Sequence, residues 1–211
     1  KIINYINKNQ PDVIFLQEIQ IDFNKSPFSQ VEIIKEKISG YKYSIHSTIY
    51  PKNKQKGEEI KIPIQHGMAI LSKYPIVNSF EYYLPLPENE TEPRSILCFD
   101  LDINGTIHKF ANIHFTNKEE IAKNQLMDFL QLMNSRNEKR IMAGDFNMFD
   151  LPQYNDLIKD YELSFNYKNY ISYPKDNGTL DYIMIPKSYK FEKLEIIENI
   201  SDHNGILIEI S

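Results

Sequence analysis

The sequence predicts an α/β fold with mixed β-sheets and helices packed outside them. Short apolar or alternating segments, typical of strands, outnumber the segments with helical periodicity. Asn104-Gly105 separates two alternating segments and predicts an antiparallel hairpin. A long amphipathic segment then leads into another apolar strand, which indicates a crossover connection. Hairpins and crossovers in one chain favour mixed sheets.

The first half of the chain alternates helices and strands. Residues 2–8 and 30–39 have helical periodicity, and the second helix is expected to end at Gly40. Strands are predicted over residues 12–18, 41–47, 67–72 and 76–84. Residues 52–61 are rich in lysine and poor in apolar side chains, which is more typical of a solvated loop than of a binding patch.

In the second half, residues 95–103 and 108–114 form the predicted hairpin. Thr116, followed by acids at 119 and 120, predicts the N-cap of a long helix with one apolar face. Strands are expected at the segment beginning with Arg140 and over residues 180–185, 191–197 and 205–210. Residues 152–159 favour a short helix, and the aromatic stretch 161–173 has no clear assignment.

Composition excludes few functions. A chain of 211 residues with 41% hydrophobic residues predicts one domain over residues 1–211, a soluble monomer without a membrane span. Cys98 stands alone, so we expect a packed thiol. The net charge of −5 argues weakly against tight duplex binding. The chain begins at Lys1 inside a helical pattern, which suggests an N-terminal truncation and leaves the compartment unknown.

The segment from Arg140 to Phe149 presents polar side chains where an apolar strand ends. In an extended chain Asp145 and Asn147 share one side, and Phe146 faces the other. Their oxygens suit Mg²⁺ and a phosphate that it holds. A strand that simply ends in an Asx turn is the structural alternative.

Similar polar residues follow or end other predicted strands: Glu18, His114, Asp181, Asp202 and His203. Charges at the mouths of buried strands are costly unless they pair or bind an ion. Six motifs occur in one order: Leu16-Gln17-Glu18, the segment 67–76, Asn112-Ile113-His114-Phe115, Gly144-Asp145-Phe146-Asn147, Leu180-Asp181-Tyr182-Ile183 and Ser201-Asp202-His203. In these motifs the chain resembles the endonuclease/exonuclease/phosphatase superfamily, with its DNase I-like fold.

This resemblance implies a four-layer α/β sandwich, with two mixed sheets packed face to face and helices outside, and a phosphoesterase dependent on Mg²⁺, with Mn²⁺ as an alternative. It assigns Glu18 and Asp202 to the metal, Asp145 and Asn147 to the nucleophile or the phosphate, and His203 and His114 to the flanks of the phosphate. Asp181 would orient a histidine, with His203 favoured. Arg94 matches a basic position that grips phosphate, although a surface ion pair is the alternative.

The chain departs from the family pattern in three places. The first strand of the family would precede Lys1. His66 stands where many members have a Glu that orients the active-site histidine, and Asn204-Gly205 follows His203 where a basic residue and Pro are frequent, which would loosen the loop. His46 and His108 are expected to be structural or solvated.

Three functions remain open from the sequence. The leading hypothesis is hydrolysis of a phosphodiester or phosphomonoester by in-line attack of an activated water. A nuclease that acts on DNA or RNA, with residues 52–61 gripping phosphates, is an alternative. A catalytically silent interaction module is an alternative from another class.

Overall fold

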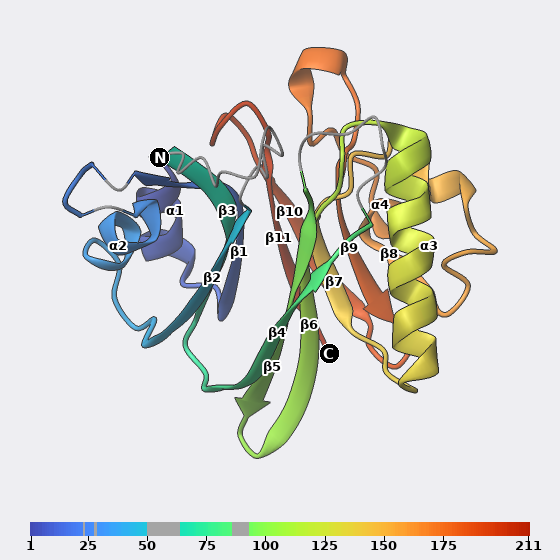
Figure 1. The fold of residues 1–211 in the computed structure, drawn as a ribbon, viewed down its shortest axis with the longest axis horizontal. Helices are drawn as coiled ribbons and strands as arrows, with labels where there is room; N and C mark the ends of the chain where they lie inside the picture. The colour runs from blue at the N-terminus through green and yellow to red at the C-terminus, as the bar shows by residue number, and fades with distance from the viewer. Residues whose placement is uncertain (23, 28, 50–63, 86–92) are drawn as a thin grey trace, which may run out of the picture. The chain divides into compact units, whose positions relative to one another are not determined.

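The computed structural model describes residues 1–22, 24–27, 29–49, 64–85 and 93–211. The chain divides into two compact units, Lys1–His108 and Lys109–Ser211, which are described separately below (Figure 1). The lysine-rich loop expected at residues 52–61 lies outside the described residues. A single domain over residues 1–211 stays a prediction.

The first unit contains a three-stranded antiparallel sheet with two helices beside it (Figure 1). Its elements are α1 (Ile2–Asn9), β1 (Val13–Asp22), α2 (Gln30–Lys35), β2 (Tyr43–Ile49) and β3 (Ile64–Ser72), and the strand order is β1-β3-β2. Apolar side chains from both helices pack with Ile19, Ala69 and Leu71 of the sheet. This burial holds the short helices in place, because isolated helices of this length are marginal in water.

Strand β1 contains a bulge at the residue that the sequence places at its end. Pairing with β3 shifts between Leu16 and Ile19, and Glu18 has φ of 53°. The strand therefore continues to Asp22 instead of ending at Glu18 as predicted, because the bulge absorbs the extra residues without ending the ladder.

Strands β4 (Ile76–Tyr83) and β5 (Ser95–Ile103) pair antiparallel in the same unit. Asn104 and Gly105 connect β5 to β6 (Thr106–His114), and both have positive φ, 55° and 87°. These angles are those of the predicted two-residue hairpin turn. Cys98 is buried in β5 and is not part of a disulfide, as expected.

The second unit contains a mixed sheet. Strand β7 (Ile141–Asp145) runs parallel to β6 and antiparallel to β9 (Asp181–Pro186), which also pairs with β8 (Tyr161–Leu163). The parallel step is bridged by α3 (Glu119–Ser135), whose buried face includes Leu126, Phe129 and Met133. Strands β10 (Phe191–Ile197) and β11 (Gly205–Ile210) form a separate antiparallel pair. The predicted combination of mixed sheets and outer helices is confirmed.

Three predicted elements are wrong in detail. Helix α2 ends at Lys35, not Ser39, because the Lys37 N–H already bonds to Ile34 O in a tighter turn. Thr116 is not the N-cap of α3: the helix begins at Glu119, and Gln125 Oε1 accepts the Thr116 N–H at 3.1 Å. The helix expected at residues 152–159 is a 3₁₀ turn (η1, Leu151–Gln153) followed by turns, since its hydrogen bonds span mostly three residues.

The aromatic stretch without a sequence assignment contains β8, the short helix α4 (Ser164–Tyr167) and an irregular segment up to Tyr173. A 3₁₀ turn, η2 (Pro174–Asp176), follows. Tyr173 and Gly178 form an isolated bridge at the base of this turn. The segment matters for function because β9 begins only a few residues later.

Candidate active site

Asp145 and Asp181 lie side by side at one end of the sheet in the second unit. Asp145 is the last residue of β7, Asp181 is the first of β9, and the two are paired in register. Because β7 and β9 are antiparallel, one strand brings its carboxylate at its end and the other at its start. The two acids thus share one mouth of the sheet.

Asn147 reaches this mouth through a turn. The strand stops at Asp145, and Asn147 has φ of 52°, so the extended geometry expected for residues 145–147 is wrong. The Asn147 N–H donates to Asp145 Oδ1 at 2.8 Å in an Asx turn, and Asn147 Nδ2 donates to Phe115 O at 2.9 Å. These bonds fix the orientation of both side chains.

His203 is held by Asp181. His203 Nδ1 lies 2.7 Å from Asp181 Oδ2, and the Tyr173 ring is tilted against the imidazole with centroids 4.7 Å apart. The hydrogen bond and charge of Asp181, aided by Asp145 and Asp202, raise the pKa of His203 from 6.5 to about 9 despite its partial burial. The imidazole is therefore protonated at neutral pH, and its Nε2 is the nitrogen available to a substrate.

His114 lies on the other side of Asp145. It ends β6 and is paired in register with Asp145, and its Nε2 lies 3.9 Å from Asp145 Oδ2. Both residues are buried. Asp202, by contrast, is exposed and acts on the cluster through its charge.

Among the described residues, Asp145, Asp181 and His203 form a group that could hold a metal ion, with one ligand atom of each within 4.8 Å of the others. Carboxylate oxygens suit Mg²⁺ or Mn²⁺. A histidine ligand must be neutral, whereas His203 is charged and bonded to Asp181. The donor set therefore fits a divalent cation on the carboxylates better than one on the imidazole.

Glu18 and Arg94 belong to the first unit. Glu18 is exposed on the β1 bulge, and Arg94 directly precedes β5, where its carbonyl accepts the Leu84 N–H at 2.9 Å. His66 on β3 and His46 on β2 are exposed, and His108 on β6 is partly buried. The assignment of Glu18 and Arg94 to the site stays a prediction, because they belong to the first unit and the cluster belongs to the second.

Ser172 supports the cluster and was not identified from the sequence. It is fully buried, and its Oγ accepts the N–H groups of Leu180 at 3.0 Å and Asp181 at 2.9 Å. These bonds fix the start of β9 and hence the carboxylate that holds His203. Nothing in the local pattern distinguishes this serine, because its partners are eight and nine residues away.

Asn204 ties the loop that carries His203 to the same segment. Its N–H donates to Ser172 O at 2.7 Å, its Nδ2 donates to Ile171 O at 3.0 Å, and its Oδ1 accepts the Asn199 N–H at 3.1 Å. The sequence flagged Asn204 only as a departure that would loosen the loop. The three bonds instead supply a restraint where other members often have a basic residue.

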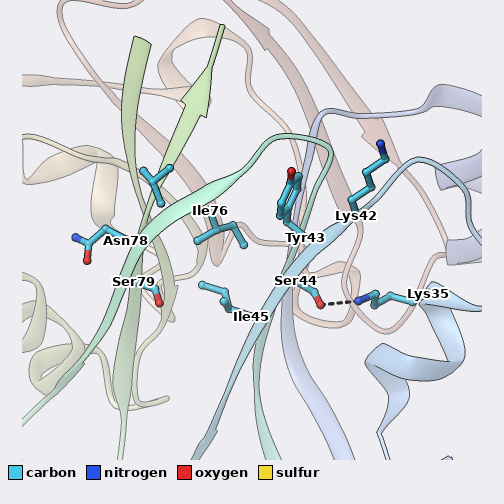
Figure 2. A pocket seen from close by; sticks show the side chains of 9 residues that line it. Lys35, Lys42, Tyr43, Ser44, Ile45, Ile76, Asn78 and Ser79 are labelled. Carbon is cyan, nitrogen blue, oxygen red and sulfur yellow. Dashed lines mark hydrogen bonds between the residues drawn. The ribbon is translucent and has the colours of Figure 1, made fainter. Parts of the chain in front are cut away.

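The first unit contains a groove of about 640 Å³ lined by Lys35 and residues 42–45 and 76–79 (Figure 2). Two of these lining residues are bonded to each other, since Lys35 Nζ donates to Ser44 Oγ at 2.9 Å. No carboxylate or imidazole is present among these described lining residues. The groove therefore lacks the acid and base groups that are present in the second unit.

Membrane insertion through a helix finds no support in the described part of the chain, where no helix combines sufficient length with sufficient apolar character to cross a bilayer.

The chain is similar to proteins of one known family. The model of the Endonuclease/Exonuclease/phosphatase family matches residues 1–203. No curated protein matches the sequence. Among solved structures, an endonuclease/exonuclease/phosphatase family protein from Leptotrichia buccalis is similar, with a TM-score of 0.74, 20% identity, and coverage of 100% of this chain and 91% of the other.

The names of two further similar structures state an enzyme activity or a bound anion. The mannosyl-6-phosphatase of Bacteroides thetaiotaomicron has a TM-score of 0.66 and 16% identity, over 100% of this chain and 89% of its own. The human Nocturnin catalytic domain with bound sulfate has a TM-score of 0.68 and 19% identity, over 100% of this chain and 84% of its own. At these identities the likeness establishes the α/β sandwich fold alone. The family follows from the match over residues 1–203: the chain belongs to the endonuclease/exonuclease/phosphatase family.

Proposed function

We propose that this protein is a divalent-metal-dependent hydrolase that cleaves a phosphate ester by in-line attack of water. The observation that carries the proposal is the cluster of Asp145, Asp181 and His203, whose ligand atoms lie within 4.8 Å of one another. The family match supports phosphoester chemistry. So do the names of two structural neighbours, one a sugar phosphatase and one with a bound sulfate, an oxyanion shaped like phosphate.

His203 serves as the cationic partner of the phosphoryl group. Asp181 occupies Nδ1 and keeps the ring protonated, so Nε2–H can donate to a phosphoryl oxygen or protonate the departing alcohol. The Tyr173 ring restricts rotation of the imidazole. A positioned, charged donor stabilises the transition state without reorganisation during the reaction.

Asp145 accepts a proton from the attacking water. Its Oδ1 accepts the Asn147 N–H, and its Oδ2 lies 3.9 Å from His114 Nε2. His114 stabilises the charge on that side of the phosphate. By the family resemblance the metal carboxylates would be Glu18 and Asp202, and within the second unit the carboxylates of Asp145 and Asp181 could also hold the Mg²⁺ or Mn²⁺ ion. When bound, the ion would neutralise charge on the phosphoryl oxygens.

The test measures hydrolysis of bis(p-nitrophenyl) phosphate with Mg²⁺, Mn²⁺ or EDTA. Asp145→Asn and His203→Gln should each reduce kcat by about 10²–10⁴. Matched controls are Asp128→Asn and His66→Gln, which change an exposed acid and an exposed histidine. Unchanged turnover in both site variants would contradict the mechanism, and activity that persists in EDTA would contradict the metal dependence.

A panel of natural substrates separates the remaining functions. Plasmid DNA, single-stranded RNA, inositol phosphates and sphingomyelin are each incubated with metal and with EDTA. Cleavage of DNA or RNA would identify a nuclease. Failure of the wild type on the whole panel and on the aryl ester would favour the catalytically silent interaction module.

A further inference from the structure

The second unit contains an aromatic cavity of about 660 Å³. Its walls include the rings of Phe149, Phe165, Tyr170 and Tyr182, and the amides of Gln153 and Asn177 lie among them. The volume is within the range of sites that bind small organic molecules. None of these residues has a role in the phosphoester chemistry described above.

The walls of the cavity are bonded to segments that carry the candidate active site. Phe149 follows Asn147 by two residues, and Gly178 and Thr179 of the opposite wall come shortly before the start of β9. Tyr170 Oη donates to Asp181 O at 2.9 Å. Ile171, another wall residue, accepts the Asn204 Nδ2–H at 3.0 Å, and Asn204 follows His203. Two wall residues are thus bonded to the segments that bring Asp181 and His203 together.

Phe149 is the unusual residue of this wall. Its ring is 45% exposed, although phenylalanine is normally buried. A Cβ atom at Gly178 would lie 2.7 Å from Phe149 Cδ1 and closer still to Cε1. Gly178 does not have a positive φ, so its backbone conformation does not require glycine. The glycine instead leaves room for the ring, which rests against the backbone and remains open to solvent.

We propose that this cavity binds a planar aromatic or heteroaromatic ring on the non-leaving alcohol of a phosphodiester substrate, with Phe149 as the stacking residue. A flat ring would cover the exposed area of Phe149, and stacking on an aromatic side chain is favourable for any such ring. Gln153 Nε2 already donates to Asp150 Oδ1, so the Asn177 amide and the Gln153 Oε1 atom offer hydrogen bonds that a heterocycle can use and an aliphatic chain cannot. The inference rests on the proposed function, because it assumes that the cluster holds the phosphate.

The test compares two diesters with one leaving group, phenyl p-nitrophenyl phosphate and methyl p-nitrophenyl phosphate, in the presence of Mg²⁺. The wild type should prefer the phenyl ester by roughly tenfold in kcat/KM, the size expected for one stacked ring. Phe149→Ala should reduce this ratio to about one. Gly178→Ala should also reduce it, since the added methyl group displaces the ring without removing it.

Met127→Ala is the matched control, because Met127 is also 45% exposed in the same unit and does not line the cavity. It should keep the wild-type ratio. A wild type that hydrolyses both esters equally well would overturn the cavity proposal and leave the proposed function intact. Retention of the preference in both Phe149→Ala and Gly178→Ala would overturn it as well.

A binding measurement keeps the two proposals separable when no ester is hydrolysed. Calorimetry compares phenyl phosphate with methyl phosphate. Tighter binding of phenyl phosphate that is lost in Phe149→Ala would support the cavity although the proposed function had failed. Equal binding of both phosphates would overturn the cavity.

Discussion

Replacing Ser172 by alanine should destabilise the protein more than its small volume suggests. The Ser172 side chain is fully buried, and its Oγ accepts two backbone N–H groups, those of Leu180 and Asp181. Alanine leaves space where the oxygen was and no acceptor for either group. A buried donor that loses its partner costs about 1–3 kcal/mol, so two such donors give a loss of about 2–6 kcal/mol.

This loss is a large part of a typical unfolding free energy of about 5–15 kcal/mol. Urea denaturation measures it, with Ser135→Ala as control, since Ser135 is exposed on α3 and its hydroxyl donates to Leu132 O. The control should change the free energy of unfolding by less than about 0.5 kcal/mol. A Ser172→Ala variant with the same m-value and a loss below about 0.5 kcal/mol would show that the two N–H groups find other partners, and would refute the reasoning.

Two further predictions concern His203 and its loop. In metal-free protein with EDTA, Asp181→Asn should lower the pKa of His203, measured by NMR, from about 9 toward 6.5. A pKa that is raised in the folded state stabilises the protein only while the imidazole is charged. The variant should therefore lose stability at about pH 6 and much less at about pH 9.5. An unchanged His203 pKa would contradict the role of the carboxylate. Asn204→Ala removes two side-chain hydrogen bonds of the loop, each worth about 0.5–1.5 kcal/mol, and should lower kcat about 3–30-fold. The control Asn134→Ala on α3 should not change kcat. Equal kcat values for Asn204→Ala and the wild type would mean that the loop does not need this restraint.

Local patterns predicted the elements well where the signal lies within a few residues. The Asn104-Gly105 turn is an example, since its positive φ values are a property of those two residues. The helix expected at residues 152–159 fails for the complementary reason. Its composition permits a helix, but the chain between Asn147 and β8 follows a series of tight turns instead. Tertiary context overrides weak intrinsic propensity.

The candidate site was predicted only in part, for a related reason. Asp145, Asp181 and His203 were chosen because polar side chains at strand ends occur in a recognisable order, and the structure brings these three together. Ser172 and Asn204 were not chosen, because their partners are backbone groups of segments that no sequence pattern links to them. A supporting residue is recognisable only when the register of the elements that it joins is known.

Glu18 shows how backbone geometry adds information that the sequence lacks. Among the described residues, the non-glycine residues with positive φ are asparagines apart from Gln10 and Glu18. Asparagine tolerates this region, and Gln10 is the C-cap of α1, where a left-handed residue is common. Glu18 has neither reason, so its conformation costs about 1–3 kcal/mol, which the surrounding ladder of β1 and β3 must offset. The bulge turns the Glu18 side chain away from the alternation of the strand. A strained carboxylate at the position that the family resemblance assigns to the metal supports the proposal that Glu18 serves the reaction and not the packing of its sheet.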